Sequence, residues 1–256
     1  MVSIRGFDHF CDFLEGLEDF YCIIGGGAAA ILLETDDLEF RATKDVDLLV
    51  LAMSDDLNDR ILQYVKTGGY ETREATEKEP KYYRFTHPTD NNCPKVIEIF
   101  ARNQLKLELN GDQRVIPISH GDGRRLSALL LDQEYFELIQ KNIIKSREGI
   151  PLINALANIC LKAAAYRDLL ERRQSGDSDI DQNDISKHLK DIWRLAVVLK
   201  GDESITISGK PQKDIDSAVR ELNGLPEAQF RQVMSKYPGV DKGTLMSVLT
   251  KIFRIQ

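Results

Sequence analysis

The sequence lacks the features of a membrane-spanning or secreted protein. Its 256 residues contain no run approaching the roughly 20 apolar residues that a membrane helix requires. The first stretch, MVSIRGFDHFCDFLEGLEDFY, carries acids and has the spacing of an amphipathic helix. It has no basic start, no continuous apolar core and no cleavage site, so it does not resemble a secretion signal. We therefore expect a cytoplasmic protein with no membrane partner.

Cysteine and histidine are both scarce, with four residues of each. Cys11, Cys22, Cys93 and Cys160 show no Cys-x-x-Cys spacing, and three of them lie in apolar surroundings. This pattern favours buried free thiols in a reducing compartment over disulfide bonds. The four histidines are scattered along the chain and offer no zinc-binding spacing.

Positive charge is also in deficit, since the net charge is −7. The surface as a whole therefore does not favour nucleic acid, although RNA and DNA are not excluded, and a polyanionic partner would have to meet a local basic patch. One such strip could form in the second half of the chain, where the alternative is an ordinary solvated helix face. Its basic residues are Lys141, Lys145, Arg147, Arg167, Arg172 and Arg173.

The apolar content, 42% of the residues, is sufficient for a large core, and its periodicity predicts an α+β protein. Up to residue 131 strand patterns alternate with helices. We predict helices over 6–19, from 25 onward and from Ser54 (the N-cap) to Gly68 and Gly69, and strands over 21–24, 45–52, 81–87, 95–101, 114–119 and 127–131.

From Asp132 onward the pattern turns helical. Apolar residues recur at helical spacing over 133–143, 151–173, 184–199, 213–223, 226–237 and 242–255, with a polar, acidic interruption at 174–184. The sequence thus predicts two domains. Residues 1–131 would form a mixed sheet with flanking helices, and residues 132–256 an all-α region.

Two acids open the strand that starts in the stretch RATKDVDLLV. Asp45 and Asp47 stand two residues apart, so on a strand both carboxylates project from one face. Like charges this close repel each other unless a cation lies between them, and Mg²⁺ is the hard ion that takes carboxylates together with phosphate oxygens. Such a site suits phosphoryl or nucleotidyl transfer. The alternative is a solvated strand entrance that binds nothing.

Two further features point to the same chemistry. The stretch IIGGGAAAILL is a buried strand, a glycine turn and a helix start, where free backbone N–H groups favour phosphate. A tight strand–helix turn also needs glycine for purely steric reasons. Glu98 lies within the apolar strand KVIEIFA, where a carboxylate is costly unless it is paired or bound to metal. The alternative is that Glu98 lies on a face of this strand that is exposed to water.

The order of a glycine turn, an Asp-x-Asp strand and a third acid on a later strand resembles the nucleotidyltransferase (polymerase-beta-like) superfamily. The elements IIGGGAAAILL and RATKDVDLLV look closest to the abortive-infection toxin branch of the AbiEii/AbiGii type. The resemblance implies a nucleotidyltransferase-type sheet in which Gly25 and Gly26 cradle a triphosphate. Asp45, Asp47 and Glu98 would be catalytic carboxylates that hold one or two magnesium ions. It also assigns three further residues to nucleotide binding, namely Gly27, Thr43 and Lys44.

The helical half extends the same resemblance. Lys162 is the only charge in PLINALANICLKAAAY, and Lys187 and Asp191 stand at i and i+4 on the next helix. Considered alone, the last two could form a surface ion pair of small energetic value. The toxin branch carries a lysine on a long helix followed by a basic and acidic pair. The resemblance therefore implies that Lys162 and Lys187 contact the nucleotide, while Asp191 orients a lysine or assists the acceptor.

The function implied is Mg²⁺-dependent transfer of a nucleoside monophosphate from an NTP such as ATP to an acceptor hydroxyl. The resemblance favours an RNA 3′ end, tRNA especially, and a toxin partnered by an antitoxin protein. Two alternatives stay open. The acceptor could be a protein or a small molecule such as an aminoglycoside, or the chain could be a nucleotide-binding module without turnover.

Overall fold

A computed structural model describes residues 4–52, 54–74, 82–101, 115–117, 132–178 and 180–255. Within these ranges the protein is α+β, with an eight-stranded mixed sheet in the order β6-β3-β4-β5-β2-β1-β8-β7. The strands are β1 Tyr21–Ile24, β2 Asp45–Val50, β3 Glu71–Glu74, β4 Tyr82–Thr86, β5 Val96–Ala101, β6 Val115–Pro117, β7 Ile143–Lys145 and β8 Pro151–Ile153.

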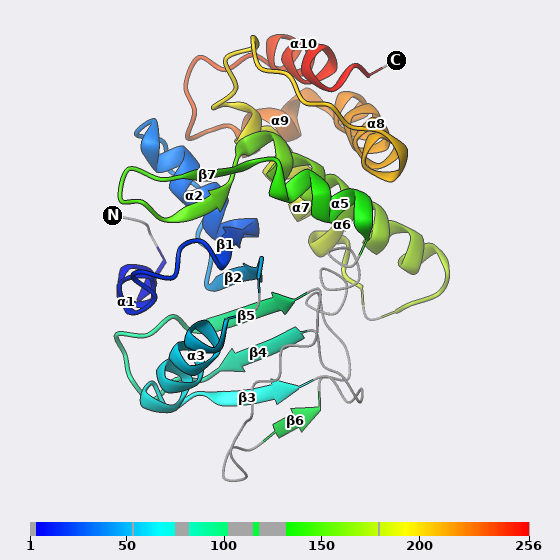
Figure 1. Ribbon diagram of the computed structural model, residues 1–256. Coiled ribbons are helices and arrows are strands. Elements are labelled where there is room, and N and C mark those ends of the chain that lie inside the picture. Colours follow the sequence, from blue (N-terminus) through cyan, green and yellow to red (C-terminus); the bar gives the residue numbers. More distant parts are fainter. Residues whose placement is uncertain are drawn as a thin grey trace.

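The helices gather mainly at one end of the sheet (Figure 1). They are α1 Phe7–Phe13, α2 Gly25–Thr35, α3 Asp55–Thr67, α5 Gln133–Gln140, α6 Ala155–Gln174, α7 Gln182–Ala196, α8 Gly209–Gly224, α9 Glu227–Val233 and α10 Lys242–Phe253. Helix α6 packs against α2, α7 and α8, so it joins the sheet to the helical region. One continuous hydrophobic core includes residues from both parts of the chain.

The centre of the sheet is formed by strands that the sequence predicts well. β1 is buried along its whole length, and it pairs antiparallel with β2, which in turn pairs parallel with β5. The apolar residues of YCII and VIEIF explain this burial, because strands covered on both faces read as nearly continuous apolar runs. Their burial fixes the register in which the acids of β2 and β5 meet.

Helix α3 confirms the predicted N-cap. The Ser54 hydroxyl oxygen accepts a hydrogen bond from the Leu57 amide, and the helix gives way to Gly68 and Gly69 at its end. Helix α1 is shorter than the 6–19 predicted, ending at Phe13, because the chain then turns through Gly16 at φ +85°. The helical spacing of apolar residues continues beyond Phe13, although the backbone is no longer helical there.

The expectation of an all-α region after residue 131 is wrong at β7 and β8. These two strands pair with each other, and β8 pairs in parallel with β1. The long helix therefore begins at Ala155 rather than at Pro151, with the Asn154 side chain accepting from the Ala157 amide as its N-cap. The residues Pro-Leu-Ile before it are buried and extend the sheet instead.

Strand β3 was not predicted, because its sequence, ETRE, has no apolar alternation; it is held by pairing with β4 and β6. The strand expected over 127–131 lies outside the described residues. No helix in the described ranges is long and apolar enough to cross a membrane. All four cysteines are buried free thiols, as predicted.

Candidate active site

One cavity of about 560 Å³ brings together most of the residues singled out from the sequence. It lies where the start of α2 and the strands β2 and β5 face α6, α7 and α8. Nine of the predicted residues line it, namely Gly25, Gly26, Thr43, Lys44, Asp45, Asp47, Glu98, Lys162 and Lys187. Asp191 and Gly27 are not among the lining residues. A cavity of this size matches the usual range for small-molecule sites.

A row of charged side chains crosses the sheet on one wall of the cavity. Asp47 on β2 is the register partner of Glu98 on β5, which is in turn the partner of Arg84 on β4. The Arg84 guanidinium donates to the Glu98 carboxylate at 2.5 Å, and Glu98 is almost fully buried. Asp45 lies two residues before Asp47 on the same strand face. The sheet therefore carries three acids side by side, one of them bound to an arginine.

Burial and the neighbouring acid both affect the protonation of Asp47. Burial is the main cause that raises the pKa of the Asp47 carboxyl, and the neighbouring Asp45 raises it further. Lys162, a side-chain hydrogen bond with Glu98 and the Gly26 amide act in the opposite direction and do not fully compensate. The neighbouring groups therefore do not offset the cost of burying the Asp47 carboxylate beside Asp45.

Gly25 makes the close approach at this corner possible. Its φ of +63° lies in the left-handed region, which other residues adopt only with strain. A Cβ atom added there would also lie far inside contact distance of the Asp47 carboxylate. The glycine therefore sets both the turn into α2 and the position of Asp47.

The next two glycines differ in what they face. A Cβ on Gly26 would lie 2.7 Å from the Thr43 hydroxyl oxygen, so Thr43 packs directly against the turn. A Cβ on Gly27 would instead meet Ile23 at 3.1 Å, on the core side of the helix. Gly25 and Gly26 form the cavity wall, while Gly27 serves packing.

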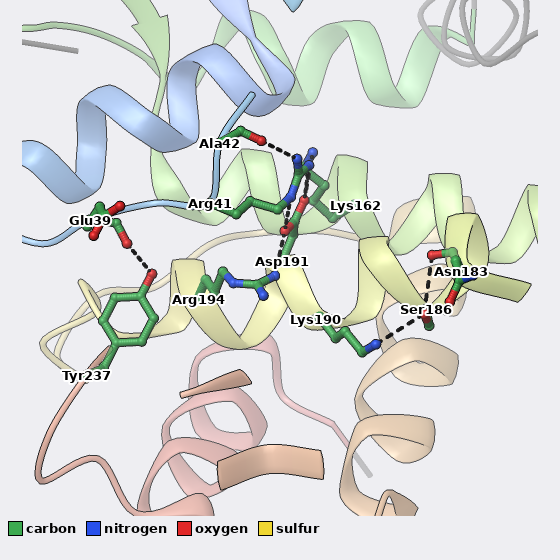
Figure 2. A network of polar contacts seen from close by, with 10 residues as sticks. All are labelled: Glu39, Arg41, Ala42, Lys162, Asn183, Ser186, Lys190, Asp191, Arg194 and Tyr237. Atoms are coloured by element: carbon green, nitrogen blue, oxygen red, sulfur yellow. Dashed lines mark hydrogen bonds and ion pairs between the residues drawn. The ribbon is translucent and has the colours of Figure 1, made fainter. Parts of the chain in front are cut away.

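The opposite wall is built around one buried carboxylate (Figure 2). Asp191 on α7 is fully buried and accepts two hydrogen bonds from Arg41, at 2.8 and 2.7 Å. Lys162 on α6 lies 3.4 Å from its second oxygen, and Arg194 donates to the first at 3.0 Å. Among the described residues, three cations thus surround a single acid, leaving an excess of positive charge.

The protonation of this cluster follows from its packing. Burial alone would raise the pKa of the Asp191 carboxyl, but Lys162, Arg41 and Arg194 together hold it well below its usual range. Burial lowers the pKa of Lys162, and Asp191 offsets part of that effect. The possibility of a surface ion pair between Lys187 and Asp191 is wrong, because Asp191 has no exposed surface.

Arg41 reaches α7 from the segment between α2 and β2, and the C-terminal region supports that segment. The Tyr237 hydroxyl donates to the Glu39 carbonyl oxygen at 2.7 Å, and Lys236 pairs with the Glu39 carboxylate at 2.7 Å. Figure 2 shows Tyr237 beside Glu39 on one side and Arg41 over Asp191 on the other. The helical region therefore positions the chain that leads into Asp45.

Several polar residues of the cavity wall were not predicted from the sequence, and two of them lie near Lys162. Asn158, one helical turn before Lys162, is fully buried and donates from Nδ2 to the Gly25 carbonyl oxygen at 2.9 Å. His188 lines the same cavity from α7, and burial, then Lys162 and Lys187, hold its pKa well below the usual value. The one available signal was helical spacing, which places Asn158 and Lys162 on one face.

The two aspartates fit a hard divalent cation. They are oxygen donors on one strand face, and both line the cavity. Glu98 fits less simply, because Arg84 already binds one of its oxygens. In the part of the chain that the structure describes, no three His, Cys, Asp or Glu side chains are placed to hold one metal ion together. Metal binding through all three acids stays a prediction.

The far end of the cavity carries mixed charge. Within the described ranges its lining residues include three bases and three acids, namely Arg167, Lys210, Lys213, Asp168, Glu171 and Asp214. Arg167 pairs with Glu171, and the Tyr135 hydroxyl donates to the Asp214 carboxylate at 2.7 Å. This end therefore favours neither a strongly anionic nor a strongly cationic ligand.

Comparison with known proteins adds no family assignment, since neither a protein-family model nor a curated protein matches the chain.

Proposed function

We propose that this protein is a Mg²⁺-dependent nucleotidyltransferase that moves a nucleoside monophosphate from an NTP to an acceptor hydroxyl. One observation carries the proposal: a single cavity has the aspartate pair and the glycine turn on one wall and a cationic cluster on the other. A nucleoside triphosphate with its metal offers the complementary charges, a cation for the acids and phosphates for Lys162. The sequence resemblance supports the same assignment.

In this proposal the chain mainly positions charged groups. Asp45 and Asp47 would hold the ion, whose Lewis acidity would lower the barrier to attack at phosphorus. The amides at the start of α2, together with Lys162 and Lys187, would bind the phosphates. Glu98, fixed by Arg84, would orient Asp47. Asp191 would orient Lys162 and Arg41, since it is too deeply buried to meet an acceptor.

The balance of the reaction is simple. The acceptor oxygen forms a bond to the α-phosphorus, the bond between that phosphorus and the bridging oxygen breaks, and pyrophosphate leaves. The hydroxyl proton passes to water. Alignment and charge stabilisation supply the rate in such reactions, so small displacements of the acids are expected to matter greatly.

For the acceptor, we propose an RNA 3′ end, tRNA especially, on the sequence resemblance. The resemblance likewise suggests an antitoxin protein as partner. The mixed charge at the far end of the cavity gives no separate support to a cationic small molecule. Glu98 contacts Asp47, so the third acid faces the aspartate pair. This arrangement supports an active enzyme and argues against a nucleotide-binding module without turnover.

The proposal is tested with each α-labelled NTP, Mg²⁺ and total RNA, followed by electrophoresis. We expect label on one RNA size class with the wild type. Asp45→Asn and Asp47→Asn should reduce labelling at least about a hundredfold, as removal of a key electrostatic group does. Both variants should stay folded, because each relieves repulsion between acids.

Asp59→Asn serves as the matched control, since Asp59 is an exposed acid on α3 outside the cavity. It should label RNA like the wild type. Label on protein in place of RNA would move the acceptor to the alternative class. No label on any acceptor with the wild type, or full labelling by Asp47→Asn, would refute the proposal.

A further inference from the structure

Buried polar atoms without a hydrogen-bond partner occur on the wall of the cavity. In the described part of the chain they include Asn158 Oδ1 and His188 Nδ1, and both residues line the cavity. An unmet buried polar atom destabilises a protein, so native structures rarely keep one without a reason. Their presence beside Lys162, in a cavity that fits a nucleotide, points to hydrogen bonds completed by a ligand.

The orientation of the Asn158 amide is determined by its neighbour. Nδ2 donates to the Gly25 carbonyl oxygen, which can only accept. The reverse orientation would set two acceptor oxygens against each other, so Oδ1 must be the atom left without a partner. The unmet group is therefore an acceptor, and its partner must be a donor.

This requirement selects one part of the nucleotide. Phosphate oxygens are acceptors at neutral pH and cannot satisfy Oδ1. Asn158 lies against Gly25, which contacts Asp47, and one helical turn before Lys162, so it belongs to the phosphate end of the site. In a ribonucleoside triphosphate, the donors closest to the phosphates are the sugar hydroxyls.

We infer that Asn158 Oδ1 accepts a hydrogen bond from a sugar hydroxyl of the bound nucleotide and makes the site selective for nucleotides that carry that hydroxyl. This inference rests on the proposed function and adds a specificity-determining residue to it. By holding the Gly25 carbonyl with Nδ2 and the sugar with Oδ1, Asn158 would connect sugar recognition to the corner that positions Asp47.

The test is equilibrium binding of each NTP with Mg²⁺ and no acceptor, compared with the 2′-deoxy and 3′-deoxy analogues. The wild type should bind the NTP roughly threefold to tenfold more tightly than one analogue, the loss expected for one uncharged hydrogen bond. Asn158→Ala should bind the NTP and that analogue equally.

Asn58→Ala is the matched control, because Asn58 also has a buried Oδ1 without a partner but does not line the cavity. It should keep the wild-type preference. Equal binding of the NTP and both analogues by the wild type would overturn the inference while leaving the proposed function in place, as would a preference retained by Asn158→Ala. Absence of nucleotide binding by the wild type would instead remove the proposed function and this inference together.

Discussion

The two walls of the cavity handle charge in opposite ways. On the sheet, Asp45, Asp47 and Glu98 crowd together, and among the described residues Arg84 is the arginine paired with them. On the helices, Arg41, Lys162 and Arg194 surround one acid, Asp191. Among the described residues the first wall carries more acids than bases, and the second more bases than acids. A ligand that carries both a cation and negative charges would therefore suit both walls.

The walls also differ in depth. Asp191 has no exposed surface, so its buried negative charge is stabilised by its three cationic partners and not by water. Asp45 and Asp47 are only partly buried and remain open to the cavity. We therefore expect substitutions in the cationic wall to act mainly on stability, and those in the acidic wall mainly on ligand binding and transfer.

The largest effect on stability is expected from Asp191→Ala. It would leave three cations close together without their acid, and breaking a buried pair in this way costs about 3–5 kcal/mol. The measurement is the free energy of unfolding from urea denaturation. Glu227→Ala removes the exposed partner of Arg231 and should change this free energy by less than about 1 kcal/mol. Equal losses in the two variants would mean that the cationic wall does not depend on Asp191.

A loss of stability no larger than this is expected from Gly25→Ala, which examines the glycine corner beside the acidic wall. The left-handed backbone costs an alanine about 1–2 kcal/mol, and overpacking against Asp47 adds about 1–3 kcal/mol. Gly16→Ala isolates the first contribution, because Gly16 has φ +85° and a Cβ there would meet nothing within 4 Å. Denaturation of both variants gives the difference. Without an excess loss for Gly25→Ala, the contact between the glycine and Asp47 would not constrain the corner.

The smallest effect concerns pH. Burial, Lys162 and Lys187 depress the pKa of His188 in the folded protein, so folding favours the neutral imidazole. Its contribution to stability should be complete above the unfolded pKa of about 6.5 and decline as the pH falls below it, by at most about 1.4 kcal/mol per pH unit.

Urea midpoints at pH 7.5 and pH 5.5 measure this decline. His188→Gln should show a weaker dependence than the wild type, whereas His87→Gln, at an exposed position, should keep it. Identical pH dependence in the wild type and His188→Gln would show that the cationic wall does not oppose protonation of this histidine.

Local rules predicted much of the fold. Ser54 begins α3, the glycine run begins α2, and the apolar strands 21–24, 45–50 and 96–101 form the buried centre of the sheet. Each of these elements follows from propensity and periodicity over a few residues. Strand β3 and the pair β7 and β8 escaped prediction, because pairing with distant strands decided their conformation.

The site shows the same division. Its acids could be placed on one strand face from spacing alone, and Lys162 stood out as a charge on an apolar helix. Arg41 and Asp191, 150 positions apart, could not be paired from the sequence, nor could Asn158 and Gly25, 133 positions apart. Such contacts depend on how α6 and α7 pack against the sheet.

The local geometry can be read from the residues alone: a glycine corner at the entry to α2 and two carboxylates projecting together from β2. These follow from backbone conformation and the two-residue period of a strand. Which charges meet depends on the packing of distant segments, because burial and partners far along the chain affect the protonation of Asp47, Lys162 and Asp191. This packing also decided that Asn158 would keep one acceptor without a donor.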